Sequence, residues 1–179
     1  MTTWAIKQNS SISFNILHTY NRKVVSADDA VKAIKSGDKI LIHSNCAFPS
    51  TLVEAMVKRK DELFDIEIFH ALTVGDLPYL GPSMKGHFRL NASFIGQNSR
   101  KAVQEGLADF MPIFLYEVPQ LFIKGKIQLD VALIHVSIPD EHGFCSFGVE
   151  VGLTKSGAER AKTVIALVNK NMPRTLGDS

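Results

Sequence analysis

Short apolar runs recur along the chain, and amphipathic stretches separate most of them. The clearest run, LDVALIHVS, is hydrophobic at nearly every position, so both faces of an extended chain would be apolar. This pattern is typical of strands buried within a parallel sheet. The runs predict strands at residues 39–43, 66–72, 88–95, 129–137 and 163–168.

Helix signals stand between the predicted strands. Ser26 followed by Asp29 is typical of a helix N-cap, and Gly37 is placed as a C-terminal cap. Ser50 is expected to cap a helix over 51–60, and further helices are expected at residues 99–104, 116–124 and 154–161. Alternating helices and strands predict the fold class α/β, with an open, largely parallel sheet and flanking helices.

The two ends of the chain differ from its middle. Residues 1–22 are polar with scattered aromatics and predict an irregular N-terminal lead-in, whereas residues 23–179 are expected to form one domain. The chain stops at NKNMPRTLGDS, directly after a predicted buried strand, although a parallel sheet needs both faces covered. Two interpretations stay open, an ordinary C-terminal tail or the boundary of a longer protein.

Composition excludes several function classes. Hydrophobic residues make up 45% and charged residues 21% of the 179 residues, as in a globular protein. The net charge of +2 and the absence of a polybasic block argue against nucleic acid and membrane surfaces as partners. The sequence shows neither a secretory signal nor an apolar run long enough to span a bilayer. Two cysteines in a chain of this length favour a reducing compartment, with the cytoplasm as the default.

Ligands of open α/β sheets bind outside the carboxyl ends of the strands, so the loops that follow the predicted strands are the candidate sites. Residues 44–49 join one strand to a helix N-terminus, where unpaired backbone N–H groups favour an anion or a polarised carbonyl oxygen. Cys46 in this loop is either a nucleophile activated by the helix N-terminus or a small residue in a tight turn. We favour the backbone-amide role for the loop and a structural role for the Cys46 side chain.

The stretch FIGQNSRKAVQEG places amide side chains where a strand passes into a helix. Gln97 and Asn98 suit hydrogen bonding to a substrate carboxylate or amide. Asn98 is equally well explained as a helix cap, with Arg100 exposed to solvent. Both interpretations remain open from the residues alone.

The stretch LDVALIHVSIPDEHGFCSFG ends a buried strand in a sharp corner. His142 and Cys145 have the residue types of a zinc site, but no second ligand pair with suitable spacing exists, so no metal is expected. His135 is interpreted as a core residue with hydrogen-bonded ring nitrogens. Asp140 is interpreted as a turn former, and Gly143 as a residue with positive φ.

Three segments together carry a family resemblance. DVALIHVSIPDEHGFCSFG resembles the strand and corner of the coenzyme A transferase superfamily. SADDAVKAIKSGDKILIHSNCAFPSTLVEAM and FIGQNSRKAVQEGLADFMPIFLYEVPQLF resemble the opening and the middle of acetyl-CoA hydrolase/transferase proteins, in the same order. The resemblance covers roughly residues 20–179 and is nearest to the 4-hydroxybutyrate/acetate CoA-transferases.

The resemblance implies a mechanism, a CoA-transferase-like fold and a substrate class. A glutamate attacks an acyl-CoA and forms a glutamyl-CoA thioester, which passes CoA to a second short-chain carboxylic acid. In the family this glutamate lies in the second half of a longer chain, so no catalytic residue is expected here. The resemblance implies a CoA thioester as substrate, no covalent cofactor, a C-terminal domain as partner and a homo-oligomer at full length.

The resemblance also implies which residues of this chain face the substrate. The loop containing Asn45, Cys46 and Ala47 is expected to give a backbone amide to the thioester oxygen, from Cys46 or Ala47. Gln97 and Asn98 match a segment that faces the substrate carboxylate. The wall of the same cleft is expected to include Ser137, Pro139, Asp140 and Gly143.

Two other function classes remain as alternatives. The chain could be a non-catalytic module that binds acyl-CoA or a partner subunit, since it contains no nucleophile of the family type and ends at a buried strand. A weaker alternative is a thiol hydrolase in which Cys46 acts with His43 or His70.

Overall fold

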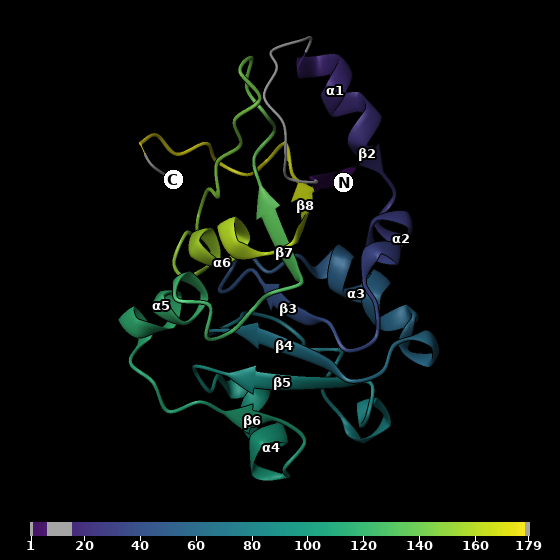
Figure 1. Cartoon of the computed structure of the whole chain (residues 1–179), viewed down its shortest axis with the longest axis vertical. Coiled ribbons are helices and arrows are strands. Elements are labelled where there is room, and N and C mark those ends of the chain that lie inside the picture. Colours follow the sequence, from purple (N-terminus) through teal and green to yellow (C-terminus); the bar gives the residue numbers. More distant parts are fainter. Residues whose placement is uncertain (1, 7–15, 178–179) are drawn as a thin grey trace.

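The computed structural model of the chain describes residues 2–6 and 16–177, and the side chains of residues 20–177. Within this part the strands form one eight-stranded sheet in the order β2-β1-β8-β7-β3-β4-β5-β6 (Figure 1). The strands are β1 (Thr2–Ile6), β2 (Val24–Val25), β3 (Lys39–Ile42), β4 (Ile66–His70), β5 (Phe88–Ala92), β6 (Asp109–Phe110), β7 (Val131–Val136) and β8 (Thr163–Val168). The helices are α1 (Ile16–Lys23), α2 (Ala27–Ala30), α3 (Ser50–Lys58), α4 (Gln97–Gln104), α5 (Val118–Ile123) and α6 (Thr154–Arg160).

The six strands from β8 to β6 are parallel, and β1 and β2 add to the β8 edge in antiparallel orientation. The predicted α/β fold with an open, largely parallel sheet is therefore confirmed. Four of the predicted strands extend past the observed carboxyl ends, because apolar residues continue from the sheet into the loops that follow it.

The structure differs from the irregular lead-in predicted over residues 1–22. β1 pairs with β8 from Thr2↔Val168 to Ile6↔Val164, and α1 follows within the same segment. A strand that joins an existing edge is held by backbone hydrogen bonds, which leave no long apolar run in the sequence. The remaining residues of the lead-in, 7–15, lie outside the described part.

The core occupies both faces of the sheet. On one face, Ile40, Ile42 and Leu133 pack with apolar side chains of α3, among them Leu52 and Met56. On the other face, alternate residues of the same strands pack against α5 and α6; this set includes Leu41, Ala132, Ile134, Phe122 and Ala158. Alternation of side chains along each buried strand explains why both helical layers are needed.

Helix α6 approaches the sheet closely at Gly157. A Cβ atom at this position would overlap Cδ2 of Leu41 and lie 3.3 Å from Cδ1 of Leu129. Both leucines are fully buried, so neither has free space to move into. The absence of a side chain therefore sets the distance between α6 and β3.

The helix starts correct two sequence predictions. Ser26 caps α2 as expected, because its Oγ accepts a 3.1 Å hydrogen bond from the Asp29 N–H. Ser50 does not cap α3: it is the first residue of that helix, and Pro49 holds the N-cap position. α4 begins at Gln97 after Gly96, and Ser99 Oγ accepts the Gly96 N–H at 3.1 Å, so Asn98 is not a cap.

The strand order creates a topological switch point between β3 and β7. From β3 the chain continues to β4 on one side, whereas β7 pairs with β3 on the other side (Figure 1). The connections at the carboxyl ends of these two strands thus leave in opposite directions. Ligands of open α/β sheets bind at such a crevice.

Candidate functional site

The loop at residues 44–49, which follows β3, is joined by hydrogen bonds to the loop that follows β4. Asn45 has a left-handed conformation with φ of 53° and forms an isolated parallel bridge with Thr73. Its N–H donates to the Leu72 carbonyl at 2.6 Å, and its carbonyl accepts from the Val74 N–H at 3.3 Å. These bonds extend the β3–β4 pairing beyond the sheet and fix both loops at its carboxyl edge.

These two loops and the start of α3 enclose a cavity of about 480 Å³. Its lining consists of Cys46, Phe48, Ser50, Glu54, Val74, Gly75, Asp76 and Pro78. The charged side chains in this lining, Glu54 and Asp76, are both acidic, so a neutral polar group such as a thioester fits this wall better than another carboxylate.

The three residues predicted for the substrate loop differ in their geometry. Cys46 is exposed and lines the cavity, whereas Ala47 is fully buried. The Asn45 N–H is already bonded to Leu72, and the Ala47 N–H donates a long 3.3 Å bond to the Ser44 carbonyl. Within the described part of the chain, the amides of Cys46 and Phe48 have no hydrogen-bond acceptor. Of the predicted donors, Cys46 is therefore the free one.

Asn98 supports the wall of this cavity. Its Nδ2 donates to the carbonyls of Thr73 and Gly75 at 3.2 and 2.8 Å, and lies 3.3 Å from the Thr73 hydroxyl. Gln97 is exposed at the start of α4. The geometry gives Asn98 a supporting role in place of the predicted cap, and a direct substrate contact of either residue stays a prediction.

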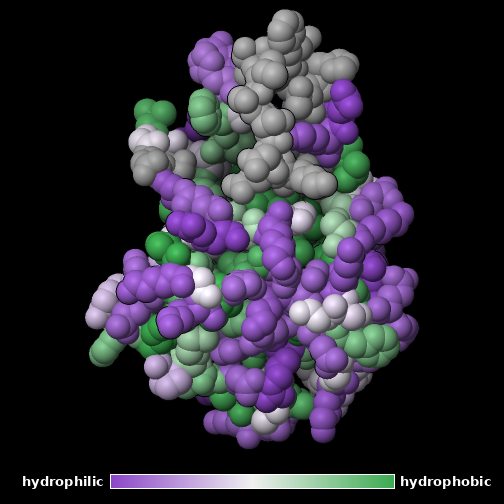
Figure 2. All heavy atoms as spheres, viewed as in Figure 1, coloured by the Kyte–Doolittle hydropathy of each residue, from purple (hydrophilic) through white to green (hydrophobic). Residues whose placement is uncertain are grey.

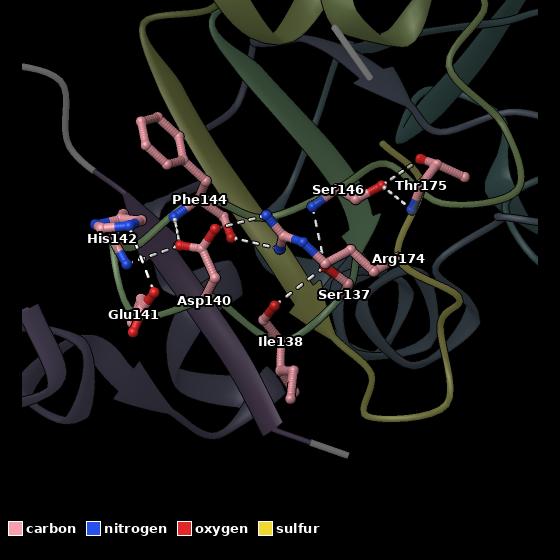
Figure 3. Close-up of polar contacts among 9 residues, drawn as sticks. All are labelled: Ser137, Ile138, Asp140, Glu141, His142, Phe144, Ser146, Arg174 and Thr175. Atoms are coloured by element: carbon pink, nitrogen blue, oxygen red, sulfur yellow. Dashed lines mark hydrogen bonds and ion pairs between the residues drawn. The ribbon is translucent and has the colours of Figure 1, made fainter. Parts of the chain in front are cut away.

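The corner after β7 is closed by the Asp140 carboxylate (Figure 3). Oδ1 accepts from the N–H groups of His142 and Phe144 at 2.9 and 2.8 Å, and Arg174 donates to Oδ2 at 2.6 Å. Burial alone would raise the pKa of Asp140, but the two amides and the guanidinium outweigh it and lower the pKa below its usual value. Gly143 has φ of 83°, which confirms the predicted left-handed turn.

Hydrogen bonds also attach the corner to the C-terminal segment (Figure 3). Ser137 Oγ accepts from the Ser146 N–H at 2.9 Å, and the Ser146 hydroxyl lies 2.5 Å from that of Thr175. A Cβ atom at Gly148, whose φ is 69°, would overlap the Met172 side chain, so close approach explains this glycine. These contacts hold the corner against the C-terminal segment.

The corner and the loop at residues 44–49 do not share one cavity. Ser137, Pro139, Asp140 and Gly143 are absent from the lining of the 480 Å³ cavity, and a separate cavity of about 440 Å³ lies between the corner and the C-terminal segment. The predicted contribution of the corner to the substrate cleft therefore stays a prediction, whereas Asn98 and the loop are brought together.

Sequence reasoning missed a buried polar network beneath the switch point. His43 is fully buried; its Nδ1 accepts the His135 N–H at 3.1 Å, and its Nε2 lies 2.8 Å from the carbonyl oxygen and 3.0 Å from Oε2 of Glu150. The Thr154 hydroxyl donates to the same Glu150 oxygen at 3.2 Å. A polar residue at the end of the apolar run ILIH was the only sequence signal of this network.

The thiol-hydrolase alternative loses its bases in this geometry. Both nitrogens of His43 are engaged, and those of His70 bind the Ala71 carbonyl at 2.5 Å and the Tyr79 hydroxyl at 2.7 Å. Burial lowers the pKa of His70 to about 4, so its imidazole is neutral near pH 7. Cys46 therefore has no available partner in either histidine.

His135 contradicts its interpretation as a hydrogen-bonded core residue. Its side chain is 9% exposed, and neither ring nitrogen has a partner within the described residues. Burial, and next the neighbouring His43, lower its pKa; the Ala47 backbone lies close enough to oppose this shift but not in hydrogen-bond geometry.

The described residues contain no group of three or more His, Cys, Asp or Glu side chains placed to hold a metal ion. The Cys145 thiol is part-buried, and burial raises its pKa to about 11, which leaves it protonated at neutral pH. None of the helices in the described ranges has the length and apolar character that crossing a membrane requires.

Comparison with known proteins assigns the family. Residues 8–179 match the family described as acetyl-CoA hydrolase/transferase N-terminal domain. The 4-hydroxybutyrate coenzyme A transferase of Clostridium kluyveri is 49% identical over 89% of this chain and 37% of its own length. The succinyl-CoA:acetate/propanoyl-CoA:succinate CoA transferase of Fasciola hepatica is 42% identical over 86% of this chain and 32% of its own length.

Solved structures agree with this assignment. The 4-hydroxybutyrate CoA-transferase of Porphyromonas gingivalis has a TM-score of 0.75 at 36% identity, covering 92% of this chain and 38% of that one. RipA of Yersinia pestis has a TM-score of 0.85 over 92% of this chain and 41% of its own; at 24% identity it supports the fold alone. The chain thus spans about two fifths or less of these relatives. It belongs to the acetyl-CoA hydrolase/transferase family, as its N-terminal domain.

Proposed function

We propose that this chain is the N-terminal domain of an acyl-CoA:carboxylate CoA-transferase that moves CoA between short-chain carboxylic acids of the 4-hydroxybutyrate/acetate type. The supporting observation is the cavity at the carboxyl edge of the sheet, beside the switch point, with the free amide of Cys46 in its wall. The names of the matched transferases suggest the substrate class, and butanoate metabolism is a fitting context.

The proposed reaction uses a glutamate that lies outside this chain. Its carboxylate attacks the thioester carbonyl of an acyl-CoA, and the CoA thiolate leaves, which gives an acyl-glutamyl anhydride. The thiolate then attacks the glutamyl carbonyl and releases the first carboxylate, leaving a glutamyl-CoA thioester. A second carboxylic acid repeats these two steps in reverse, takes the CoA and regenerates the glutamate. CoA is thus a substrate group, and no covalently bound cofactor is needed.

Residues of this chain would bind the thioester rather than attack it. The loop at residues 44–49 would donate the Cys46 amide to the carbonyl oxygen on which negative charge develops. Glu54 and Asp76 in the same wall disfavour a second anion there, so the acceptor carboxylate would enter from the part of the cleft formed by the C-terminal domain. Asn98 would hold the opposing wall through Thr73 and Gly75.

Exposed apolar side chains at this edge favour a partner domain. Phe94 and Phe110 are about half exposed, and Phe114, Leu115 and Tyr116, which precede α5, are 71%, 59% and 76% exposed. Figure 2 shows hydrophobic surface among hydrophilic side chains on the side of the molecule where α5 lies. Apolar area of this kind is stabilised when it is covered, and the proposal assigns that cover to the C-terminal domain.

The proposal is tested by transferase assays with butyryl-CoA and acetate, using this chain alone and the same chain expressed with its downstream reading frame. Activity is expected only with the downstream part, and replacing the reactive glutamate there by Gln should abolish it. Transfer by the 179-residue chain alone would refute the placement of the nucleophile. Parallel measurement of free CoA release separates transfer from hydrolysis, which depends on how well water is excluded.

The exposed apolar side chains also support a second candidate function, a non-catalytic module that binds acyl-CoA or assembles with a partner subunit. Analytical ultracentrifugation of the chain, followed by titration with butyryl-CoA, tests it. Self-association, or saturable binding of butyryl-CoA without turnover, would support this function. The absence of turnover should then persist when the downstream part is expressed with the chain. A monomer that binds no acyl-CoA would dismiss it. The full-length form is expected to be a homo-oligomer in a reducing compartment such as the cytoplasm.

A further inference from the structure

The fold satisfies both nitrogens of two buried imidazoles but neither nitrogen of a third. His43 and His70 each have a partner at Nδ1 and at Nε2. Both ring nitrogens of His135 are shielded from solvent and lack a partner in the described part of the chain. A buried polar group without a partner lowers the stability of the folded state, so an unpaired imidazole at this position calls for an explanation.

The position of His135 in the sheet shows which segment its ring lies against. The residue lies on β7, two positions after Leu133, so its side chain shares the sheet face that α3 covers. The pairing Ile42↔Leu133, continued by two residues, places Ser44 beside His135 across the switch point. The ring therefore lies beneath the loop at residues 44–49, close to the Ala47 backbone.

The acceptor available to the His135 ring is a backbone carbonyl of the loop at residues 44–49. The His135 N–H is bonded to Nδ1 of His43, which fixes the backbone of β7 from the opposite side of the sheet. The loop has an acceptor available, because the Ala47 carbonyl has no hydrogen bond within the described residues and Ala47 is fully buried. A neutral imidazole has one N–H to donate, which matches this carbonyl.

We propose that His135 is the positioning residue of the loop at residues 44–49: in solution its ring N–H binds the nearby Ala47 carbonyl, a bond that the described geometry leaves open, and thereby orients the peptide between Ala47 and Phe48. The described chain has no cis peptide bonds, so the carbonyl and the N–H of this peptide point in opposite directions. Drawing the Ala47 carbonyl toward β7 turns the Phe48 N–H away from the sheet. Phe48 lines the cavity, and its amide has no acceptor in the described structure.

This inference rests on the proposed function for its consequence but not for its geometry. If the cavity holds a thioester, the Phe48 amide becomes a second donor beside that of Cys46, and two donors are the usual number around a developing oxyanion. The sequence-based candidates were Cys46 and Ala47. If His135 anchors the Ala47 carbonyl, the second amide donor is that of Phe48 rather than that of Ala47.

The test measures the loop directly by NMR on the 179-residue chain, without substrate. In the ¹⁵N-labelled protein, the His135 ring is expected as one neutral tautomer with a slowly exchanging N–H and a coupling to the Ala47 carbonyl. His135→Phe fills the space without a donor and should raise amide exchange at Asn45 and Ala47, the hydrogen-bonded amides of the loop, about tenfold, the ratio expected from one ordinary hydrogen bond. His135→Gln retains a donor and should restore exchange to within about threefold of the parent protein.

His142→Phe is the matched control, because it makes the same change at an exposed histidine of the corner and should leave the loop unchanged. Exchange at β4 amides reports global stability and separates local loosening from unfolding. A ring that exchanges rapidly between tautomers, or equal loop exchange in His135→Phe and the parent protein, would overturn the proposal. Failure of the transferase assay would leave these measurements unaffected, so the two proposals fail independently.

Discussion

Replacing Asn98 with Asp tests whether this residue supports the cavity wall. The change keeps the size of the side chain but removes the Nδ2 donor that now lies 2.8 Å from the Gly75 carbonyl and 3.2 Å from the Thr73 carbonyl. At neutral pH a carboxylate oxygen would face these two carbonyl oxygens in place of the NH₂ group. Repulsion should therefore be added to the loss of the hydrogen bonds.

The magnitude follows from these contacts. One ordinary hydrogen bond contributes about 1 kcal/mol, and Asn98 shares its donor among three acceptors, so Asn98→Ala should cost about 1 kcal/mol in the free energy of unfolding. The Thr73 side is buried and the Gly75 side is exposed, which limits the added repulsion through solvent screening. Asn98→Asp should cost about 2–3 kcal/mol at pH 7.

Urea unfolding at pH 7 and pH 3.5, with amide exchange of Val74, whose N–H donates to the Asn45 carbonyl, measures both effects. Lowering the pH protonates the introduced carboxyl group and restores a donor, so the two substitutions should converge in stability at pH 3.5. The amides of the Thr73–Gly75 wall should exchange faster in Asn98→Asp than in Asn98→Ala at neutral pH.

Gln97→Glu provides the matched control. It makes the same amide-to-acid change one residue earlier, at an exposed position of α4, and should alter stability by less than about 0.5 kcal/mol. The reasoning would be refuted if Asn98→Asp were no less stable than Asn98→Ala at pH 7, or if the Glu control cost as much.

Three further outcomes are expected. Burial lowers the pKa of His70 to about 4 from 6.5, so the unfolded chain binds more protons between these values, and stability should fall by about 3 kcal/mol from pH 6.5 to pH 4 in urea titrations. His70→Phe should flatten that profile, and an unchanged slope would contradict the assignment. Gly157→Ala should lower the urea midpoint, with a cost of about 1–3 kcal/mol for the overlap with Leu41 that outweighs the gain in helix propensity; a raised midpoint would show that α6 can move. Asp140→Ala should leave Arg174 only its 2.9 Å hydrogen bond to the Phe144 carbonyl and speed tryptic cleavage after Arg174 several-fold; cleavage at the parent rate would show that Asp140 does not hold the C-terminal segment.

Five of the six parallel strands and the helical layers could be predicted because buried strands leave continuous apolar runs, whereas β6 (Asp109–Phe110) has only two residues and leaves no such run. The run from 129 to 137 indicated β7, and the 163–168 run indicated β8 without error. β1 could not be found in this way, because an antiparallel edge strand is fixed by its ladder with β8 and needs few apolar residues. Local pattern carries no information about that pairing.

For the candidate site, the sequence indicated a region of the fold but not the contacts within it, and the binding of substrate there stays a prediction. Strand ends followed by loops indicated the carboxyl edge, where the cavity lies. From its residue type, Asn98 was predicted to cap a helix or to bind a substrate. In the structure its side-chain amide donates instead to the backbone carbonyls of Thr73 and Gly75. The unsatisfied ring of His135 was hidden for a similar reason, because hydrogen-bond partners come from segments far apart in the sequence.

The strand order has a consequence for how the chain folds. At the centre of the sheet Ile40 of β3 pairs with Val131 of β7, and at the β8 edge Thr2 of β1 pairs with Val168. These two strand pairs therefore join residues that lie far apart in the sequence. Folding is slowed because the chain loses the entropy of closing these long loops before the contacts between the paired strands can stabilise it. The neighbouring pairs β3–β4 and β4–β5 need much shorter closures. During synthesis these strands can pair early, with the inner edge of β3 exposed until β7 leaves the ribosome, and the switch point between β3 and β7 forms only then.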